Sequence, residues 1–119
     1  TRVPSRVEVL VTATTDAGGA NPYCAMAYRL RNVGSSRLTV FAAEIAATDV
    51  RSGAPLRMPT TTIPFSSVQP GEVKEWTTAG AHGARCDQVR LQVTRVTCSP
   101  RCESAAWTQQ GLAALETPR

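Results

Sequence analysis

The sequence predicts an all-β protein, an antiparallel sandwich of two sheets with six or seven strands. Three observations support this fold class. Apolar and polar residues alternate with a period of two in several stretches of the chain. Clusters of glycine, proline, asparagine, aspartate and serine separate these stretches, as turns do. Helical stretches of about 10–15 residues, which a βαβ protein needs between its strands, are missing from the sequence.

The first two expected strands, Arg6–Thr14 and Tyr23–Asn32, show the alternation most clearly. Each has an apolar face that we expect to point into the core. In the first strand this face is made by Val7, Val9, Val11 and Ala13. In the second strand it is made by Cys24, Met26, Tyr28 and Leu30. Residues 16–22, which are rich in turn formers, connect the two strands.

The third strand is expected over Arg37–Arg51. Its inner face is expected to consist of Phe41, Ala43, Ile45 and Ala47. The alanines around Glu44 are also compatible with a helix, but the β-branched and aromatic residues of the segment favour a strand. Thr60–Ile63 lies between two prolines and is expected to be an edge strand, because proline cannot donate to a ladder.

The last third of the chain is expected to hold three further strands. The first of them, Glu72–Thr78, has Trp76 as its expected core anchor, and Ala79–Arg85 is expected to be a loop. The next, Cys86–Cys98, has an apolar inner face. This inner face is made by Val89, Leu91 and Val93. The last strand is expected over Glu103–Thr108.

The length and composition fit one globular domain. The chain has 119 residues, of which 42 % are hydrophobic and 18 % charged. We expect a single β-sandwich domain over residues 1–119, with residues 1–5 and 112–119 frayed. A short helical turn is compatible with the segment after Gln109.

The formal net charge is +4, and the positive charge comes almost wholly from arginine, since Lys74 is the only lysine. The arginines are spread along the chain, which argues against a dedicated nucleic-acid patch. No apolar run approaches the ~20 residues that a membrane helix needs. We therefore expect no nucleic-acid partner and no transmembrane segment.

Four cysteines in a small β-rich chain are typical of an oxidising compartment. The sequence starts at Thr1 without a methionine, so we expect that an export signal was removed. These features predict a periplasmic or secreted protein.

The segment from Tyr23 to Val96 carries several features of one family. An apolar strand ends in a polar turn with glycine at 30–34, and a long strand ends in an aspartate and a glycine turn at 47–53. A Pro-Gly pair precedes a strand at 68–72, and an alternating strand follows at 89–96. In these features the segment resembles the immunoglobulin-like modules of bacterial exported proteins, including the type named for its FxLYD motif. The resemblance implies an immunoglobulin-like sandwich that serves in binding or assembly.

Residues for catalysis are scarce. The only histidine, His82, lies in a loop without a neighbouring nucleophile or orienting acid. No serine sits in a Gly-x-Ser-x-Gly setting. Glu72 and Glu75 are close in sequence but point to opposite sheet faces. We therefore expect that the protein is not an enzyme and needs no cofactor.

The cysteines allow two alternatives to disulfides. Cys98 and Cys102 have loose metal-ligand spacing, and Cys24 with Cys86 could complete a zinc site. Arg101 could also lower the pKa of a neighbouring thiol and favour redox chemistry. A small-ligand, metal or thiol-redox binding domain that uses Cys98 and Cys102 is therefore the alternative function. Disulfides without a bound metal are the main expectation, because zinc sites more often show two tight pairs.

Strand direction predicts which cysteines pair. If each turn reverses the chain, Cys24 and Cys86 begin two strands at the same end of the molecule. Cys98 and Cys102 flank a turn at the other end. Crossed pairs would have to span about 40 Å, whereas the Cα atoms of a disulfide lie within ~7 Å. We predict Cys24–Cys86 and Cys98–Cys102, provided that a fourth strand exists between the third and the fifth.

Because the sequence shows no reactive cluster, it predicts a non-catalytic interaction or assembly module of the bacterial cell envelope, stabilised by disulfides. Arg29 and Arg31 share the outer face of the second strand, and Arg90 lies on the outer face of the sixth. These arginines are candidates for binding another envelope protein of acidic character. The Thr60–Ile63 edge is a candidate for strand addition by a partner, although its prolines are protective.

Overall fold

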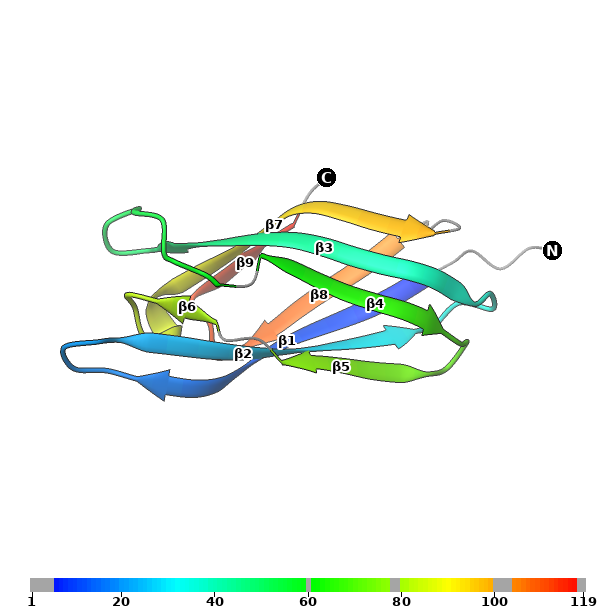
Figure 1. Ribbon diagram of the computed structural model, residues 1–119, viewed down its shortest axis with the longest axis horizontal. Coiled ribbons are helices and arrows are strands. Elements are labelled where there is room, and N and C mark those ends of the chain that lie inside the picture. Colours follow the sequence, from blue (N-terminus) through cyan, green and yellow to red (C-terminus); the bar gives the residue numbers. More distant parts are fainter. Residues whose placement is uncertain (1–5, 60, 78–79, 100–103, 118–119) are drawn as a thin grey trace.

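The computed structural model describes residues 6–59, 61–77, 80–99 and 104–117. In these residues the chain forms nine strands and one short 3₁₀ helix, with no α-helix (Figure 1). The first five strands are β1 (Arg6–Ala17), β2 (Tyr23–Asn32), β3 (Leu38–Asp49), β4 (Thr62–Val68) and β5 (Val73–Thr77). The remaining elements are β6 (Ala81–His82), η1 (Cys86–Gln88), β7 (Val89–Ser99), β8 (Ser104–Gln110) and β9 (Ala114–Glu116).

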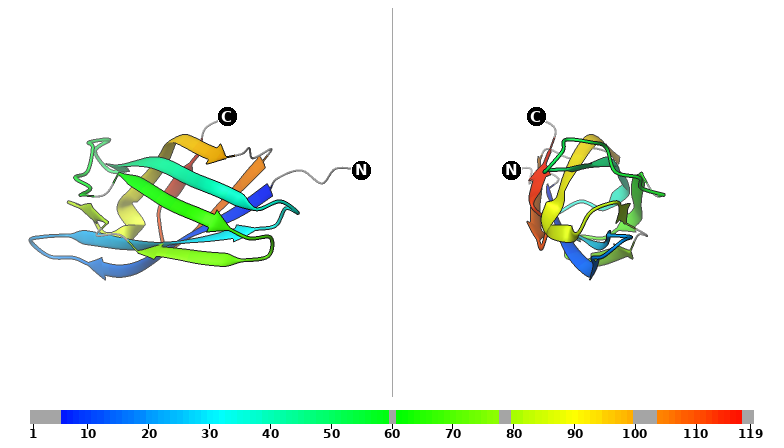
Figure 2. Two further views of the ribbon diagram at one scale, coloured as in Figure 1. Left: turned by 45° about the vertical axis from the view of Figure 1, so that its right-hand side comes forward. Right: turned by 90° about the vertical axis from the view of Figure 1, so that its left-hand side faces the viewer.

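The strands form two sheets that pack face to face. Sheet A has the order β5-β2-β1-β8, with β6 also paired to β2, and sheet B has the order β4-β3-β7-β9. The end-on view shows the two layers enclosing the core (Figure 2, right). The predicted all-β sandwich is therefore confirmed.

The sequence suggested purely antiparallel sheets, but both sheets are mixed. β8 pairs in parallel with β1, and β9 pairs in parallel with β7. The reason for the parallel β1–β8 pair is that the chain passes from sheet B to sheet A between β7 and β8. β7 ends at the end of the molecule where β1 begins, so a strand that returns beside β1 has to run in the same direction as β1 (Figure 1).

The core consists of the inward faces of the long strands, and it matches the predicted alternation. β1, β2, β3 and β7 supply most of the fully buried apolar side chains. These include Val7, Val9, Val11, Cys24, Met26, Tyr28, Leu30, Phe41, Ala43, Ile45, Ala47, Val89, Leu91 and Val93. Burying one large aliphatic or aromatic side chain contributes about 1.5–3 kcal/mol, so this face-to-face contact is the main source of stability.

Trp76 is not the core anchor that the sequence suggested. It lies on β5, at the edge of sheet A, and its side chain is 39 % exposed. It shares the inner side of the sheet with Tyr28, its register partner on β2, but the edge position leaves it only partly covered. Trp107 on β8 contributes instead, because its half-buried ring lies 6.2 Å from that of Phe41, measured between centroids.

Several expected boundaries differ from the structure. The edge strand is present, but β4 continues through Pro64 to Val68; Thr60 lies outside the described residues. Pro64 is tolerated because β4 has only β3 as a neighbour and one side of its backbone needs no ladder. The expected loop before Cys86 contains β6, which pairs with β2.

Of residues 112–119, where fraying was expected, the structure describes 112–117, and residues 118–119 lie outside the described residues. Leu112 is buried, and β9 pairs with β7. No helical turn follows Gln109, because β8 continues to Gln110 and leads through a short turn into β9. Glu103, the expected start of the last strand, lies outside the described residues. No described helix is long and apolar enough to cross a lipid bilayer.

Candidate interaction surface

The outer face of sheet A presents its side chains in three cross-strand rows. Register brings together residues of β8, β1, β2 and β5 that point away from the core. From β8 to β5 the rows are Ala106, Glu8, Arg31 and Val73; then Thr108, Leu10, Arg29 and Glu75; then Gln110, Thr12, Ala27 and Thr77. We call this set the sheet A outer face.

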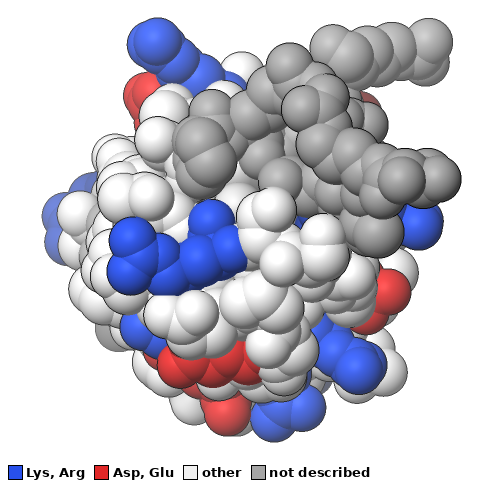
Figure 3. All heavy atoms as spheres, turned by 90° about the vertical axis from the view of Figure 1, so that its right-hand side faces the viewer, with Lys and Arg blue, Asp and Glu red and all other residues white. Residues whose placement is uncertain are grey.

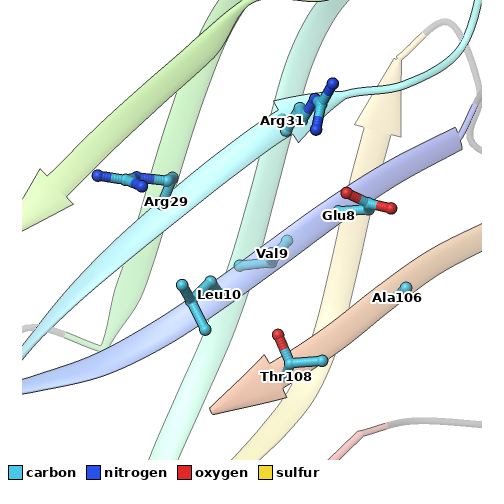
Figure 4. A pocket seen from close by; sticks show the side chains of 7 residues that line it. All are labelled: Glu8, Val9, Leu10, Arg29, Arg31, Ala106 and Thr108. Carbon is cyan, nitrogen blue, oxygen red and sulfur yellow. The ribbon is translucent and has the colours of Figure 1, made fainter. Parts of the chain in front are cut away.

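Two adjoining hollows of about 350 and 310 Å³ lie on the sheet A outer face. They share Leu10 and Arg29, so together they form one shallow trough along the rows. In the first hollow, Arg29 and Arg31 of β2 lie on one side and the β8 residues on the other, with Leu10 between them (Figure 4). The half-buried Leu10 gives the trough an apolar floor, with Arg29 and Arg31 along one wall and uncharged β8 residues along the other.

The two arginines of this face differ in their partners. Arg29 forms an ion pair with Glu75 at 3.4 Å, but both side chains are more than half exposed, so this pair is weak. Arg31 lies opposite Glu8 in the register, yet no ion pair within 4 Å joins it to any described residue. The Arg31 guanidinium therefore keeps its five donors available for a ligand.

Arg90 does not join this surface. It lies on β7 in sheet B, and its guanidinium is 3.8 Å from the carboxylate of Glu116 on β9. Sheet A and sheet B present their outer faces on opposite sides of the sandwich (Figure 2). The three candidate arginines therefore divide into Arg29 and Arg31 on one side and Arg90 on the other.

No large patch of a single sign is visible at the end of the molecule seen in Figure 3. Basic side chains there lie among uncharged ones, with acidic side chains between them. At this end of the molecule the described side chains therefore form no broad basic field.

The Cys24–Cys86 disulfide is present as predicted. The two Cα atoms are 4.8 Å apart, and both residues are buried. Cys86 lies in η1 and not, as expected, in a strand, so the bridge fastens β2 of sheet A to the segment that leads into β7 of sheet B. Both sulfurs are used in this bond and are not available as zinc ligands, which removes the four-cysteine zinc site.

The second predicted bridge, Cys98–Cys102, remains a prediction, because Cys102 lies outside the described residues. Cys98 is half-buried on β7 and is disulfide-bonded, so no described cysteine is a free thiol.

A carboxylate supports the disulfide from β1, and sequence reasoning missed it. Asp16 accepts a hydrogen bond from the backbone N–H of Cys86 at 3.1 Å and pairs with Arg85 at 3.3 Å. These two donors, the Cys86 N–H first, lower the pKa of Asp16 below its ordinary value of 3.8. The ionised carboxylate thus holds η1 against the end of β1.

Asn32 is the other position that the sequence did not single out. Its side chain is fully buried and donates to the carbonyls of Ser36 at 2.9 Å and Val68 at 3.1 Å. Its side-chain oxygen accepts from the N–H of Gly34 at 3.0 Å. One side chain therefore ties the β2–β3 turn to the end of β4, next to Arg31 of the trough.

His82 packs against a neighbouring ring and joins two segments through its backbone. Its ring contacts that of Tyr23 in a tilted arrangement, with 4.7 Å between the centroids and 44° between the ring planes. Its backbone N–H donates to the carbonyl of Arg57 at 2.9 Å. These contacts fix β6 and the loop before β4 to the start of β2.

Comparisons with protein-family models, with curated proteins and with solved structures found no match to this chain. Inference about its function therefore rests on its own surfaces.

Proposed function

We propose that the protein is a disulfide-stabilised, non-catalytic interaction module of the bacterial cell envelope, and that its sheet A outer face binds an acidic segment of another envelope protein. The observation that carries the proposal is the trough in which Leu10 and Arg29 are shared by two adjoining hollows and Arg31 has no ion-pair partner among the described residues.

The chemistry of the trough suits an extended acidic peptide. Guanidinium groups recognise carboxylates through parallel hydrogen bonds, which gives both attraction and orientation. A peptide that follows the strand direction would place alternate side chains on the trough, where Leu10 and Ala106 offer apolar contact between the charged positions. Arg31 can bind a carboxylate without first losing a partner, and Arg29 can exchange its exposed pair with Glu75.

The placement in the envelope is supported by the Cys24–Cys86 bridge, since structural disulfides persist mainly in oxidising compartments. The non-catalytic role is supported by the setting of His82, whose ring packs in a tilted arrangement against that of Tyr23, as in a packing residue.

The proposal can be tested by following backbone amide signals by NMR while three extended peptides of equal length are added, one rich in aspartate and glutamate, one rich in lysine and one neutral. We expect the acidic peptide to shift signals of β1, β2 and β8, where the trough lies. The other two peptides should leave these signals in place. Shifts confined to sheet B, or equal shifts with all three peptides, would contradict the proposal.

A further inference from the structure

The four edges of the two sheets are protected to different degrees. β4 contains Pro64 and has Ser67 at φ 52°, a kinked backbone that opposes pairing. β5 is five residues long and carries Lys74 and Glu75, and β9 is three residues long. Charges, proline and short length are the devices by which sheet proteins prevent pairing between molecules.

β8 has none of these devices. It spans Ser104–Gln110 with the sequence SAAWTQQ, which contains no charge, proline or glycine. All seven residues keep regular register with β1. No backbone hydrogen bond from the described residues reaches its other side. Among the residues that the structure describes, a regular row of N–H and C=O groups is therefore unpaired along this edge, and such a row pairs naturally with another strand.

We propose that β8 pairs antiparallel with β8 of a second copy of this chain, so that two A sheets become one continuous sheet across a twofold axis. Such a contact is isologous, since each copy uses the same strand. It also closes, because the joined sheet ends on both sides in β5, whose charged residues oppose further addition. The expected assembly is a dimer and not a fibre.

Symmetry selects the register of this pairing. When a twofold axis relates two antiparallel strands, both copies keep the same face of the sheet toward solvent. A residue on the outer face therefore lies opposite an outer-face residue of the other copy, and a core-facing residue lies opposite a core-facing one. Overlap of all seven residues then requires the axis to pass beside Trp107. In this register Trp107 lies opposite Trp107, and Ala106 lies opposite Thr108.

The side chains that this pairing brings together favour a second copy of the chain as the partner of β8. The strand has no charged residue, so two copies oppose no like charges along it. Ala105 and Trp107 are only half-buried at this margin, and the second copy would cover the part that is exposed. One pair of seven-residue strands buries less than a standard interface, so the dimer should be weak and concentration-dependent.

This contact uses the edge of sheet A and not its outer face, so it is independent of the proposed function. If both hold, the dimer carries two troughs on one continuous sheet and can bind two acidic segments at once. The two contacts respond to salt in opposite directions. Salt weakens binding of an acidic peptide, whereas it strengthens pairing of two chains that each carry a formal net charge of +4.

Sedimentation velocity over a concentration series that reaches the millimolar range tests the dimer. In the A106K/T108K variant, like charges face each other twice in the proposed register; in A106K/T108E the same positions carry opposite charges. We expect the wild type and A106K/T108E to dimerise at high concentration, and A106K/T108K to remain monomeric. T39K/T97K, which adds the same two charges at exposed positions of sheet B, should dimerise as the wild type does.

Hydrogen exchange on the wild type gives a second measurement that needs no substitution. The amides of β8 that point away from β1 should become more protected as the protein concentration rises, while those of β5 should not change. A wild type that stays monomeric throughout would overturn the proposal. So would equal dimerisation of A106K/T108K and the wild type, or monomers of both charge variants while circular dichroism shows them folded.

Discussion

Asn32 is completely buried, yet both polar atoms of its side-chain amide have partners. Buried amides of this kind are costly to disturb, because removal of the side chain takes away the hydrogen bonds that it donates to the carbonyls of Ser36 and Val68. The same residue accepts at its backbone carbonyl from Gly71, so it links the two turns at this end of the sandwich.

The N32A variant should therefore lose about 3 kcal/mol of unfolding free energy, from three hydrogen bonds at roughly 1 kcal/mol each. Denaturant unfolding at neutral pH measures the loss. The exposed Asn21 in the β1–β2 turn provides the control, and N21A should change stability very little. Equal effects of the two substitutions would show that the Asn32 network contributes nothing special.

Tyr28 gives a pH dependence at the alkaline end. Its side chain is buried, and the hydroxyl has only the sulfur of Met26 as a described hydrogen-bond partner, at 3.8 Å. Burial raises the pKa of Tyr28 above its ordinary value of 10.0. In the unfolded chain the phenol ionises first, so unfolding becomes more favourable as the pH rises past about 10.

We expect the wild type to lose stability above that pH more steeply than Y28F, which has no ionisable group at this site. At neutral pH Y28F should differ by less than about 1 kcal/mol, because a thioether is a weak acceptor. Chemical denaturation at a series of alkaline pH values compares the two. Parallel pH profiles would mean that Tyr28 ionises as readily in the folded as in the unfolded protein.

At the scale of the elements, Gly80, the residue directly before β6, shows how closely the chain approaches β2 at this point. Its φ is +84°, and an ideal Cβ built on it would lie 2.6 Å from the Cα of Ala25. Backbone atoms cannot move away as a flexible side chain can. Alanine at this position therefore combines an unfavourable backbone conformation with a steric clash.

G80A should cost about 3 kcal/mol or more, whereas G53A should cost only about 1 kcal/mol. Gly53 is the matched control, since its φ is +75° but nothing lies within 4 Å of an added Cβ. Thermal unfolding of both variants measures the difference. If G53A is as destabilised as G80A, backbone conformation alone accounts for the loss and the close approach of β6 is not supported.

The long strands could be predicted because each has one buried face, and the apolar alternation records that face directly. The alternation in β7 moves by one residue at a bulge beside Glu44, so Val93 and Val96 both point inward although their separation is odd. Trp76 and Arg90 show the limit. Alternation assigns a side chain to a face, but which sheet a strand joins and what covers an edge depend on pairing over long distances in sequence.

The candidate surface was predictable to the same extent. Arg29 and Arg31 share the outer face of β2 because they are two residues apart. Their combination with Leu10 and the β8 residues was not predictable, because it requires that β1 lie between β2 and β8. The Cys24–Cys86 pair was found because strand direction restricts which ends can meet.

At the scale of the whole molecule, this disulfide joins residues that are 62 positions apart. In the chain-entropy model, closing a loop of that length stabilises the folded protein by about 4 kcal/mol. C24A/C86A should lose about this amount in denaturant unfolding while it keeps a β-type circular dichroism spectrum. A loss below about 1 kcal/mol would indicate that β2 and η1 are held together by packing alone.

The central claim is that Arg29 and Arg31 make the sheet A outer face a site for acidic segments, and one binding measurement tests it most directly. The affinity of an acidic peptide is measured at low and at physiological salt for the wild type, R29E/R31E and R37E/R57E. Each replaced arginine removes two units of charge, so both variants fall from a formal net charge of +4 to 0. Arg37 and Arg57 are exposed but lie outside the trough.

We predict that salt weakens wild-type binding and that R29E/R31E binds about tenfold or more weakly, about 1.4 kcal/mol, at physiological salt. R37E/R57E should bind nearly as the wild type does, because charges beyond a Debye length of about 8 Å are screened. Equal weakening of both variants would show that only net charge matters. Unchanged binding of R29E/R31E would contradict the claim outright.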